Sequence, residues 1–372
     1  MLSCKEYLDK NYNIGCKVTP VNFNFKKGLF GIKAIKYLVG KKNQVFAFYG
    51  KPSEIKPTSG YPAVLLIHGG MGYAYYEWVR KWTNRGYVAI APDYDAQIAI
   101  DDEHRQVVNP VGGPKGYGSV YETESDDPWI YFSILSSIKA IDILCEDKDV
   151  DKNKIVLDSI SWGGFVGMKL LSIDKRIKAA TIKYSAAYIS ETTWGQDEGL
   201  KKLTNQQIYI YNRFFDPQND LHNIKTPILF AAGTDDRCFM MNTRKKTSDA
   251  VGSQIKAFGY RLHYDHGHFE GWKTSEAIDF ADSILNGNEI VKLNFDISSN
   301  GNIMIKGNEN ISDITICYTI CDFYKTEKCD WAEVVIDNNF VLPENVSAYF
   351  ITYIVDNKTH YSTDVFVKQF NK

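Results

Sequence analysis

The chain has 372 residues, 44% of them hydrophobic, and its 43 basic and 45 acidic side chains leave a net charge of −2. This balance excludes a strongly basic, phosphate-tracking face, so no nucleic-acid partner is expected. The N-terminus lacks the apolar core of a secretory signal, and no run approaches the roughly 18 apolar residues of a membrane span. The seven cysteines are irregularly spaced and form no C-x-x-C pair, which favours buried, unpaired thiols and a cytoplasmic protein.

Apolar runs and helical periodicities alternate along most of the chain. We expect strands at 44–50, 63–70, 87–93, 154–160, 177–184, 227–233 and 255–264. We expect helices at 75–86, 128–146, 162–172, 242–252 and 275–285. Strands that alternate with helices predict an α/β fold, a mostly parallel sheet flanked by helices. A long loop interrupts the alternation at 94–127, and loops of this length are usually functional or disordered.

The pattern changes near Lys292 to short alternating strands with turn signals between them and no helical periodicity. It predicts a small C-terminal antiparallel β-sandwich domain. We therefore divide the chain into residues 1–59, an N-terminal extension with the first strands of the sheet, residues 60–287, the central α/β domain, and residues 290–372, the C-terminal domain.

The stretch LDSISWGGF (157–165) holds the strongest candidate for a nucleophile, Ser161. A serine at the tip of a tight strand-to-helix turn needs small residues two positions before and after it, and Ser159 and Gly163 meet that demand. Ser-x-Gly alone is weak evidence, because about two matches are expected by chance in a chain of this length. The second match, Ser299-Asn300-Gly301, has no helix after it and is typical of a turn, whereas Ser161 follows a strand and opens a helix.

A serine hydroxyl needs a base and an acid, and on such a sheet the chain order is Ser, then Asp or Glu, then His. The stretch PILFAAGTDDRCF offers Asp235 and Asp236 after a later strand. We favour Asp236 as the acid, because it is the third residue past the turn glycine, and Asp235 is more typical of a cap for the following turn.

Three histidines follow the last strand of the sheet, in RLHYDHGHFEGW. His263 is expected on the strand itself. His268 follows a glycine and precedes the last helix, so it is the preferred base, with His266 as the alternative. No third ligand with suitable spacing is evident, so we expect neither a metal nor another cofactor.

The oxyanion of an acyl-transfer reaction needs two N–H donors. One is expected from the backbone of Trp162, directly after the nucleophile, and the other from Gly70 or Met71 in the loop HGGMG (68–72). His68 is expected to orient this loop and not to catalyse.

These motifs resemble the acetyl xylan esterase and dienelactone-hydrolase-like branch of the α/β-hydrolases, which is related to prolyl-oligopeptidase-type serine hydrolases. The resemblance spans roughly residues 40 to 286 and depends most on SISWGGF, FAAGTDDRCF and DHGHFEGW. It implies an α/β-hydrolase fold, with the nucleophile at Ser161, the acid at Asp236 and the base at one histidine of the His-Gly-His cluster. The chain departs from relatives at Ser159, where they have glycine, and after Asp93, where small residues are missing.

The resemblance implies a serine carboxylic-ester hydrolase that forms an acyl-enzyme, with acetyl groups of small or carbohydrate esters as the expected substrates. Two alternatives stay open. One is a serine oligo- or aminopeptidase of the prolyl-oligopeptidase type, and the other is a non-catalytic glycan-binding protein. No membrane partner is expected, and a homo-oligomer is left open.

Overall fold

The computed structural model describes residues 3–12, 17–21, 31–41, 43–95, 97–99, 106–108, 119–298, 300–307, 309–325, 329–336 and 340–368. Ser299, Cys16 and, in the loop at 94–127, residues 96, 100–105 and 109–118 lie outside these residues. Within them, no helix combines the length and the apolar character that crossing a membrane requires.

The helices agree with the expected periodicities to within a few residues. The α-helices are α1 (Cys4–Asn11), α2 (Tyr76–Thr83), α3 (Trp129–Glu146), α4 (Trp162–Ile173), α5 (Asn205–Phe214), α6 (Met241–Ala250), α7 (His268–Lys273) and α8 (Glu276–Leu285). Helices α1, α5 and α7 were not among the elements expected from the sequence.

The central strands are β1 (Val18–Pro20), β2 (Ile32–Val39), β3 (Asn43–Gly50), β4 (Tyr61–Ile67), β5 (Val88–Pro92), β8 (Val150–Ile160), β9 (Ile177–Lys183), β10 (Ile228–Gly233) and β11 (Lys256–Arg261). A small hairpin, β6 (Gln97–Ala99) and β7 (Gln106–Val108), lies in the long loop. The C-terminal strands are β12 (Asn294–Ile297), β13 (Ile303–Lys306), β14 (Ile311–Thr319), β15 (Ala332–Val335), β16 (Ala348–Val355), β17 (Thr359–Ser362) and β18 (Phe366–Val367).

The central sheet has the order β1-β2-β3-β5-β4-β8-β9-β10-β11. Its strands from β5 to β11 are mutually parallel, and β1 to β3 join antiparallel at one edge. The predicted α/β architecture is confirmed. Ligands of parallel sheets bind beyond the carboxyl ends of the strands, so a ligand site is expected at the loops after β4, β8, β10 and β11.

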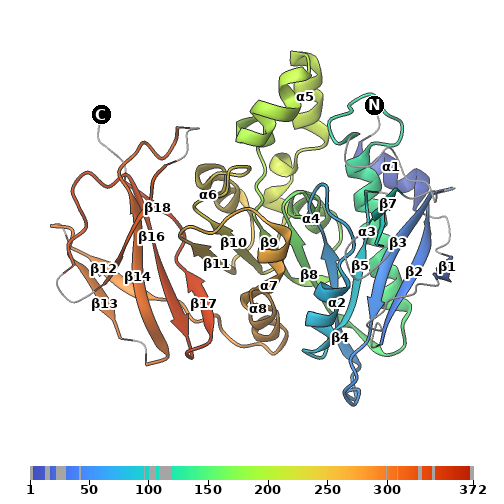
Figure 1. Cartoon of the computed structure of the whole chain (residues 1–372), viewed down its shortest axis with the longest axis horizontal. Helices are drawn as coiled ribbons and strands as arrows, with labels where there is room; N and C mark the ends of the chain where they lie inside the picture. The colour runs from blue at the N-terminus through green and yellow to red at the C-terminus, as the bar shows by residue number, and fades with distance from the viewer. Residues whose placement is uncertain are drawn as a thin grey trace.

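Helices cover both faces of this sheet (Figure 1). Arg85 after α2 binds Asp279 of α8 across 2.9 Å, which ties these two helices together on one face. Successive side chains of a strand point to opposite faces. Asp158 of β8 points toward α2, where its carboxylate accepts hydrogen bonds from the indoles of Trp78 and Trp82. Its neighbour Leu157 therefore points to the opposite face, against α4.

Asp158 also binds Lys183 of β9 in a fully buried ion pair, with 2.9 Å between Nζ and Oδ1. Burying two charges is costly unless they pair and find further hydrogen bonds, and here the two tryptophan indoles supply them. The ion pair joins β8 and β9 two residues before β8 ends at Ile160. It therefore stabilises the strands on which the next segment, the turn at Ser161, is built.

The C-terminal segment is antiparallel, as expected, but it does not stand apart from the central sheet. Strand β17 pairs with the edge strand β11 at Phe258 and Ser362, so the sheet continues through β17, β16, β14 and β15 (Figure 1, orange to red). The N–H of Tyr260 donates to the Ser362 hydroxyl at 2.9 Å, and its ring packs edge-on against Phe350. Periodicity could not predict this continuity, because it shows which strands form and not which edges they join.

Because the C-terminal strands cover the edge of β11, removing residues 287–372 should expose the unpaired edge of this strand and the buried Tyr260 ring. We expect this truncation to aggregate or to unfold at a clearly lower temperature, as measured by size-exclusion chromatography and thermal unfolding. A chain ending at residue 368 is the matched control. A monodisperse truncated protein with the midpoint of the full chain would contradict the prediction and support an independent central domain.

Candidate active site

Ser161 occupies the sharp turn between β8 and α4, with a left-handed backbone φ of 55° and ψ of −125°. Such angles are strained for a residue with a side chain and persist only where the surroundings enforce them. Here the Ser161 N–H donates to the Lys183 carbonyl at 2.8 Å, and its carbonyl accepts from Gly164 and Phe165 at the start of α4. The turn presents the hydroxyl at the carboxyl end of the sheet, as the sequence analysis expected.

The residues around Ser161 are small because the backbones lie close together. A Cβ at Gly163 would lie 2.3 Å from the Ile67 carbonyl oxygen and 2.4 Å from that of His68, so no side chain fits there. Ser159, where relatives have glycine, is fully buried, and its hydroxyl donates to the Thr181 carbonyl at 2.8 Å. The departure at Ser159 is therefore accommodated by one internal hydrogen bond.

His266, and not His268, lies beside Ser161. Its Nε2 is 2.8 Å from the Ser161 Oγ, and its Nδ1 is 3.0 Å from the Asp236 Oδ2. These contacts bring Ser161, Asp236 and His266 together in the order hydroxyl, imidazole, carboxylate. The imidazole packs between the rings of Tyr184 and Phe239, which holds its plane.

These contacts do not support His268, the preferred base, and favour the alternative, His266. His268 is the first residue of α7, which turns its ring away from Asp236 and toward Tyr75 and the loop after β4. Burial lowers the pKa of His268 to about 4, so the ring is neutral near pH 7. His263 was expected on the last strand, but β11 ends at Arg261, and His263 lies beyond it, exposed and in contact with Asp235 at 3.3 Å.

Asp236 is buried, and its carboxylate is fully engaged. One oxygen accepts hydrogen bonds from the N–H groups of Cys238 and Phe239, at 2.8 and 3.0 Å. The other oxygen contacts His266 and also lies 2.5 Å from the Nη2 atom of Arg244 in α6. Burial alone would raise the pKa of Asp236, but the charges of Arg244 and His266 outweigh it and hold the pKa below its ordinary value.

Arg244 is a site residue that the sequence analysis missed. Its guanidinium is buried and donates to the Gly233 carbonyl at 3.1 Å. A signal was present, because Met241, Arg244, Thr247 and Ser248 recur at helical spacing and form the buried face of α6. A charged side chain on the buried face of a helix is rare without a partner.

The loop after β4 supplies the second candidate donor for an oxyanion. Met71 has a left-handed φ of 58°, and its N–H already donates to the Asp95 carboxylate at 3.1 Å, which leaves Gly70 as the better of the two alternatives. Gly69 must be a glycine, since a Cβ there would lie 2.8 Å from the Ser161 Cβ and 2.6 Å from the His268 Nε2. Trp162 is the first residue of α4 and follows Ser161 directly, so its N–H stays the first candidate donor.

His68 orients this loop. Its Nδ1 lies 2.7 Å from the Gly69 carbonyl oxygen, and its Nε2 accepts a hydrogen bond from the Tyr94 N–H at 3.1 Å. Because Nε2 accepts, the proton is on Nδ1. Burial lowers the pKa of His68 to about 3, so the ring stays neutral and acts as a fixed brace between two loops.

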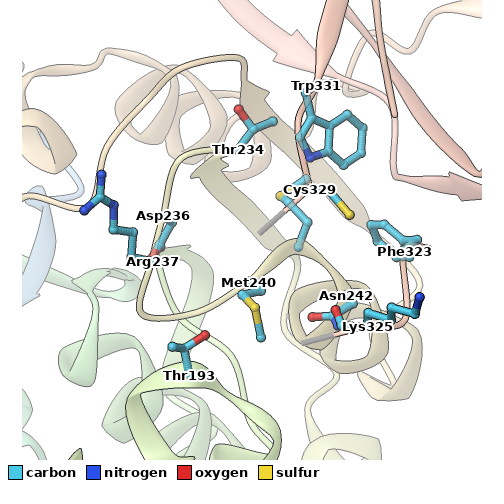
Figure 2. Close-up of a pocket in the computed structure, with 11 residues that line it drawn as sticks. Thr193, Thr234, Asp236, Arg237, Met240, Asn242, Phe323, Lys325, Cys329 and Trp331 are labelled. Carbon is cyan, nitrogen blue, oxygen red and sulfur yellow. The ribbon is translucent and has the colours of Figure 1, made fainter. Parts of the chain in front are cut away.

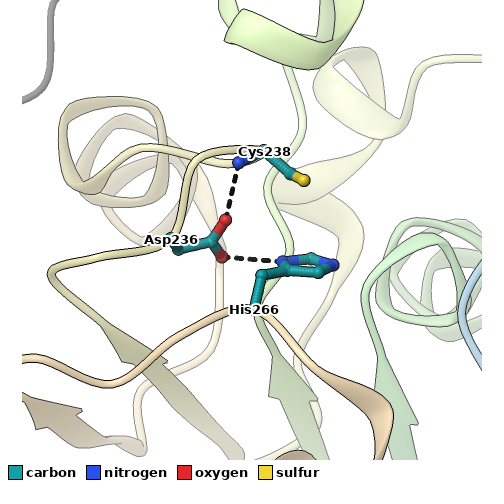
Figure 3. Close-up of side chains that lie close together, drawn as sticks. All are labelled: Asp236, Cys238 and His266. Atoms are coloured by element: carbon teal, nitrogen blue, oxygen red, sulfur yellow. Dashed lines mark hydrogen bonds and ion pairs between the residues drawn. The ribbon is translucent and has the colours of Figure 1, made fainter.

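Asp236, Cys238 and His266 offer ligand atoms within 4.8 Å of one another, which is close enough for a metal ion (Figure 3). The carboxylate, however, already has the positive charge of Arg244 beside it. The Cys238 thiol is a poor ligand, since burial, followed by the charge of Asp236, raises its pKa to about 12. The contacts favour a serine–histidine–carboxylate hydrogen-bond chain, with the proton exchanged between Ser161 and His266, over a metal centre.

The loop between β10 and α6, which carries Asp236 and is called the acid loop below, borders the C-terminal segment. A cavity of about 320 Å³ lies between them, lined by Met240 and Asn242 on one side and by Phe323 and Trp331 on the other (Figure 2). A disulfide joins Cys321 and Cys329 near this cavity. The expectation of unpaired thiols was wrong for this pair, because irregular spacing did not reveal that their Cα atoms lie 5.7 Å apart. Disulfides persist mainly in oxidising compartments, so the cytoplasmic location stays a prediction.

The strand-turn-helix serine, the loop carboxylate and the imidazole after the last strand, on a mostly parallel sheet, define an α/β-hydrolase. The sequence pattern of the dienelactone hydrolase family matches residues 46–275, and the chain belongs to that family. Membership identifies it as a hydrolase that acts on ester bonds. No curated protein sequence matches the chain.

Solved structures with the same fold include two acetyl xylan esterases. The enzyme from Paenibacillus sp. R4 is 18% identical, with 76% of this chain and 92% of that chain covered and a TM-score of 0.58. Acetyl xylan esterase 1 from Thermoanaerobacterium sp. JW/SL YS485 is 16% identical, with 76% and 91% covered and a TM-score of 0.55. The acylaminoacyl peptidase of Pyrococcus horikoshii is 17% identical, with 71% and 43% covered and a TM-score of 0.53. At these identities the likeness supports the fold.

The closeness of Gly163 to two carbonyl oxygens predicts that Gly163→Ala separates α4 from the loop after β4. We expect a loss of about 1–3 kcal/mol in the free energy of unfolding, the usual cost of overpacking, and a lower kcat/KM for a test ester. Gly259→Ala is the control, because its Cβ would meet nothing nearer than 3.5 Å. Equal melting temperatures and equal activities for the two variants would contradict the close approach.

Proposed function

We propose that the protein is a serine carboxylic-ester hydrolase that works through an acyl-enzyme, with acetyl groups of small or carbohydrate esters as its substrates. The observation that carries the proposal is the continuous contact from the Ser161 hydroxyl through His266 to Asp236. The family membership supports ester hydrolysis, and the acetyl xylan esterase neighbours suggest the acetyl group.

In this mechanism the Ser161 Oγ attacks the ester carbonyl while the His266 Nε2 takes its proton. Asp236 accepts the hydrogen bond from Nδ1–H, which fixes the tautomer and stabilises the imidazolium. The N–H groups of Trp162 and Gly70 stabilise the negative oxygen, and each such donor is typically worth about two to three orders of magnitude in rate.

The imidazolium then gives its proton to the departing alcohol, which leaves the acyl group on Ser161. In the second half, a water molecule attacks the acyl carbonyl and His266 takes the water proton. Collapse of the tetrahedral intermediate returns that proton to Ser161 and releases the acid. The neutral rings of His68 and His268 take no part in these transfers.

A serine peptidase would use the same three residues. The structural similarity to an acylaminoacyl peptidase is the reason to consider this alternative. The matched region spans 43% of the length of that peptidase. Comparing kcat/KM for p-nitrophenyl acetate and for an aminoacyl p-nitroanilide decides between them, and faster turnover of the anilide would overturn the ester assignment. The preformed contact between Ser161 and His266 weighs against a non-catalytic glycan-binding protein.

Ser161→Ala should lower kcat for p-nitrophenyl acetate by at least about three orders of magnitude, because the nucleophile is lost and only binding and oxyanion stabilisation remain. Circular dichroism and the melting temperature should stay close to those of the wild type. Undiminished turnover by a folded Ser161→Ala protein would rule out this serine as the nucleophile.

Replacing His266 and His268 one at a time shows which of the two histidines is the base. His266→Ala should lose about as much activity as Ser161→Ala, and the double variant should be no worse than either, because the residues act as one unit. His268→Ala should lose far less. The assignment would be reversed if His268→Ala proved inactive while His266→Ala retained turnover.

A further inference from the structure

The carboxylate of Asp236 has two cationic or potentially cationic neighbours on the same oxygen. The His266 Nδ1 lies 3.0 Å and the Arg244 Nη2 lies 2.5 Å from Oδ2. The side chains of Asp236 and Arg244 are 0% and 3% exposed, so water hardly screens their interaction. A carboxylate that only oriented a histidine would not require a buried guanidinium behind it.

We propose that Arg244 is a positioning residue that keeps Asp236 ionised and limits its attraction for the protonated His266, and so sets the pH below which the triad stops working. The inference rests on the proposed function of Ser161, Asp236 and His266. Arg244 touches no reacting atom and acts only through the carboxylate.

The direction of the effect follows from charge alone. Asp236 and His266 share a hydrogen bond and bind their proton as a coupled pair, so the pH at which the pair gains a proton belongs to both. A fixed positive charge beside the pair makes a further proton less favourable. Arg244 therefore extends activity to lower pH, and its removal must move the acidic limb of the rate profile upward.

The neighbouring titratable groups considered next are either neutral near pH 7 or exposed to solvent, so Arg244 is the buried fixed charge that acts on Asp236 and His266. Burial keeps the thiol of Cys238 and the ring of His268 neutral near pH 7, with pKa values of about 12 and 4. Burial also raises the pKa of the Tyr184 and Tyr260 hydroxyls well above the ordinary value. Arg237 and Asp265 are exposed, where solvent screens their charges.

The position of Arg244 also explains how its charge stays in place. Its Nη1 donates to the Gly233 carbonyl at 3.1 Å, at the end of β10, so the guanidinium is tied to the same strand that leads into the acid loop. Movement of α6 relative to β10 would carry the charge away from Asp236. The geometry thus couples helix packing to the working pH of the site.

The test is the pH profile of kcat/KM for p-nitrophenyl acetate, from about pH 5 to about pH 9, a range that brackets histidine titration. For Arg244→Met and Arg244→Gln we expect the acidic limb of the profile to move to higher pH by about one to two pH units. This is the effect of a unit charge a few ångström away at an effective dielectric constant of about 20. Activity should return at high pH. Arg244→Lys keeps the charge and should keep the limb near its wild-type position.

Lys246→Met is the matched control, because it removes a cation from the same helix that is paired with Glu191 at the surface. A uniform loss of activity in Arg244→Met and Arg244→Gln, with the limb unmoved, would overturn the proposal and make Arg244 purely structural. If neither variant folds, the lysine variant decides, since an upward shift there contradicts a role for the charge. A wild-type rate no higher than that of Ser161→Ala would instead overturn the proposed function.

Discussion

The strained backbone at Ser161 is the constraint on which the rest of the site depends. A residue with a φ of 55° between a strand and a helix is held there by its neighbours and not by its own preference. The N–H of Ser161 is bound by the carbonyl of Lys183, and Gly163 lies against the carbonyls of the loop after β4. Beneath the turn, the buried pair of Lys183 and Asp158 joins the two strands that support it. The Ser161 hydroxyl is held at the carboxyl end of the sheet because several buried contacts restrain the chain around it.

The three charged or titratable side chains in contact at the site have different roles. Arg244 is permanently positive, Asp236 is held negative beside it, and His266 is the group left to change its charge. The two other histidines nearby, His68 and His268, are kept neutral by burial and brace the loop after β4. Proton transfer is thereby confined to one imidazole among three. His266 can therefore accept the proton of Ser161 without competition from His68 or His268.

Sequence reasoning located most of this site because chain order and strand ends are visible in a periodic pattern. Ser161 follows directly on one apolar run and Asp236 is the third residue past another, so their positions at the carboxyl edge of the sheet could be predicted. The choice between His266 and His268 could not, because it depends on where α7 begins, and α7 has only six residues. Arg244 lies on the buried face of α6, and the helical spacing that marks this face is visible in the sequence, but the face is weakly marked because most residues of α6 are polar.

The C-terminal segment marks another limit of sequence reasoning. Its alternating residues predicted antiparallel strands, but pairing between β11 and β17 depends on which edge is left open by the rest of the chain. The proximity of Cys321 and Cys329 likewise depends on how their loop folds. The domain boundaries stay predictions, since the sheet runs on through both parts.

The most direct test of the central claim is mass mapping of the protein after reaction with a fluorophosphonate, which modifies only serines that a neighbouring base activates. The account predicts one modified peptide, containing Ser161, and loss of the modification in His266→Ala but not in His268→Ala. A modified residue other than Ser161, or an unmodified protein that still hydrolyses esters, would contradict it.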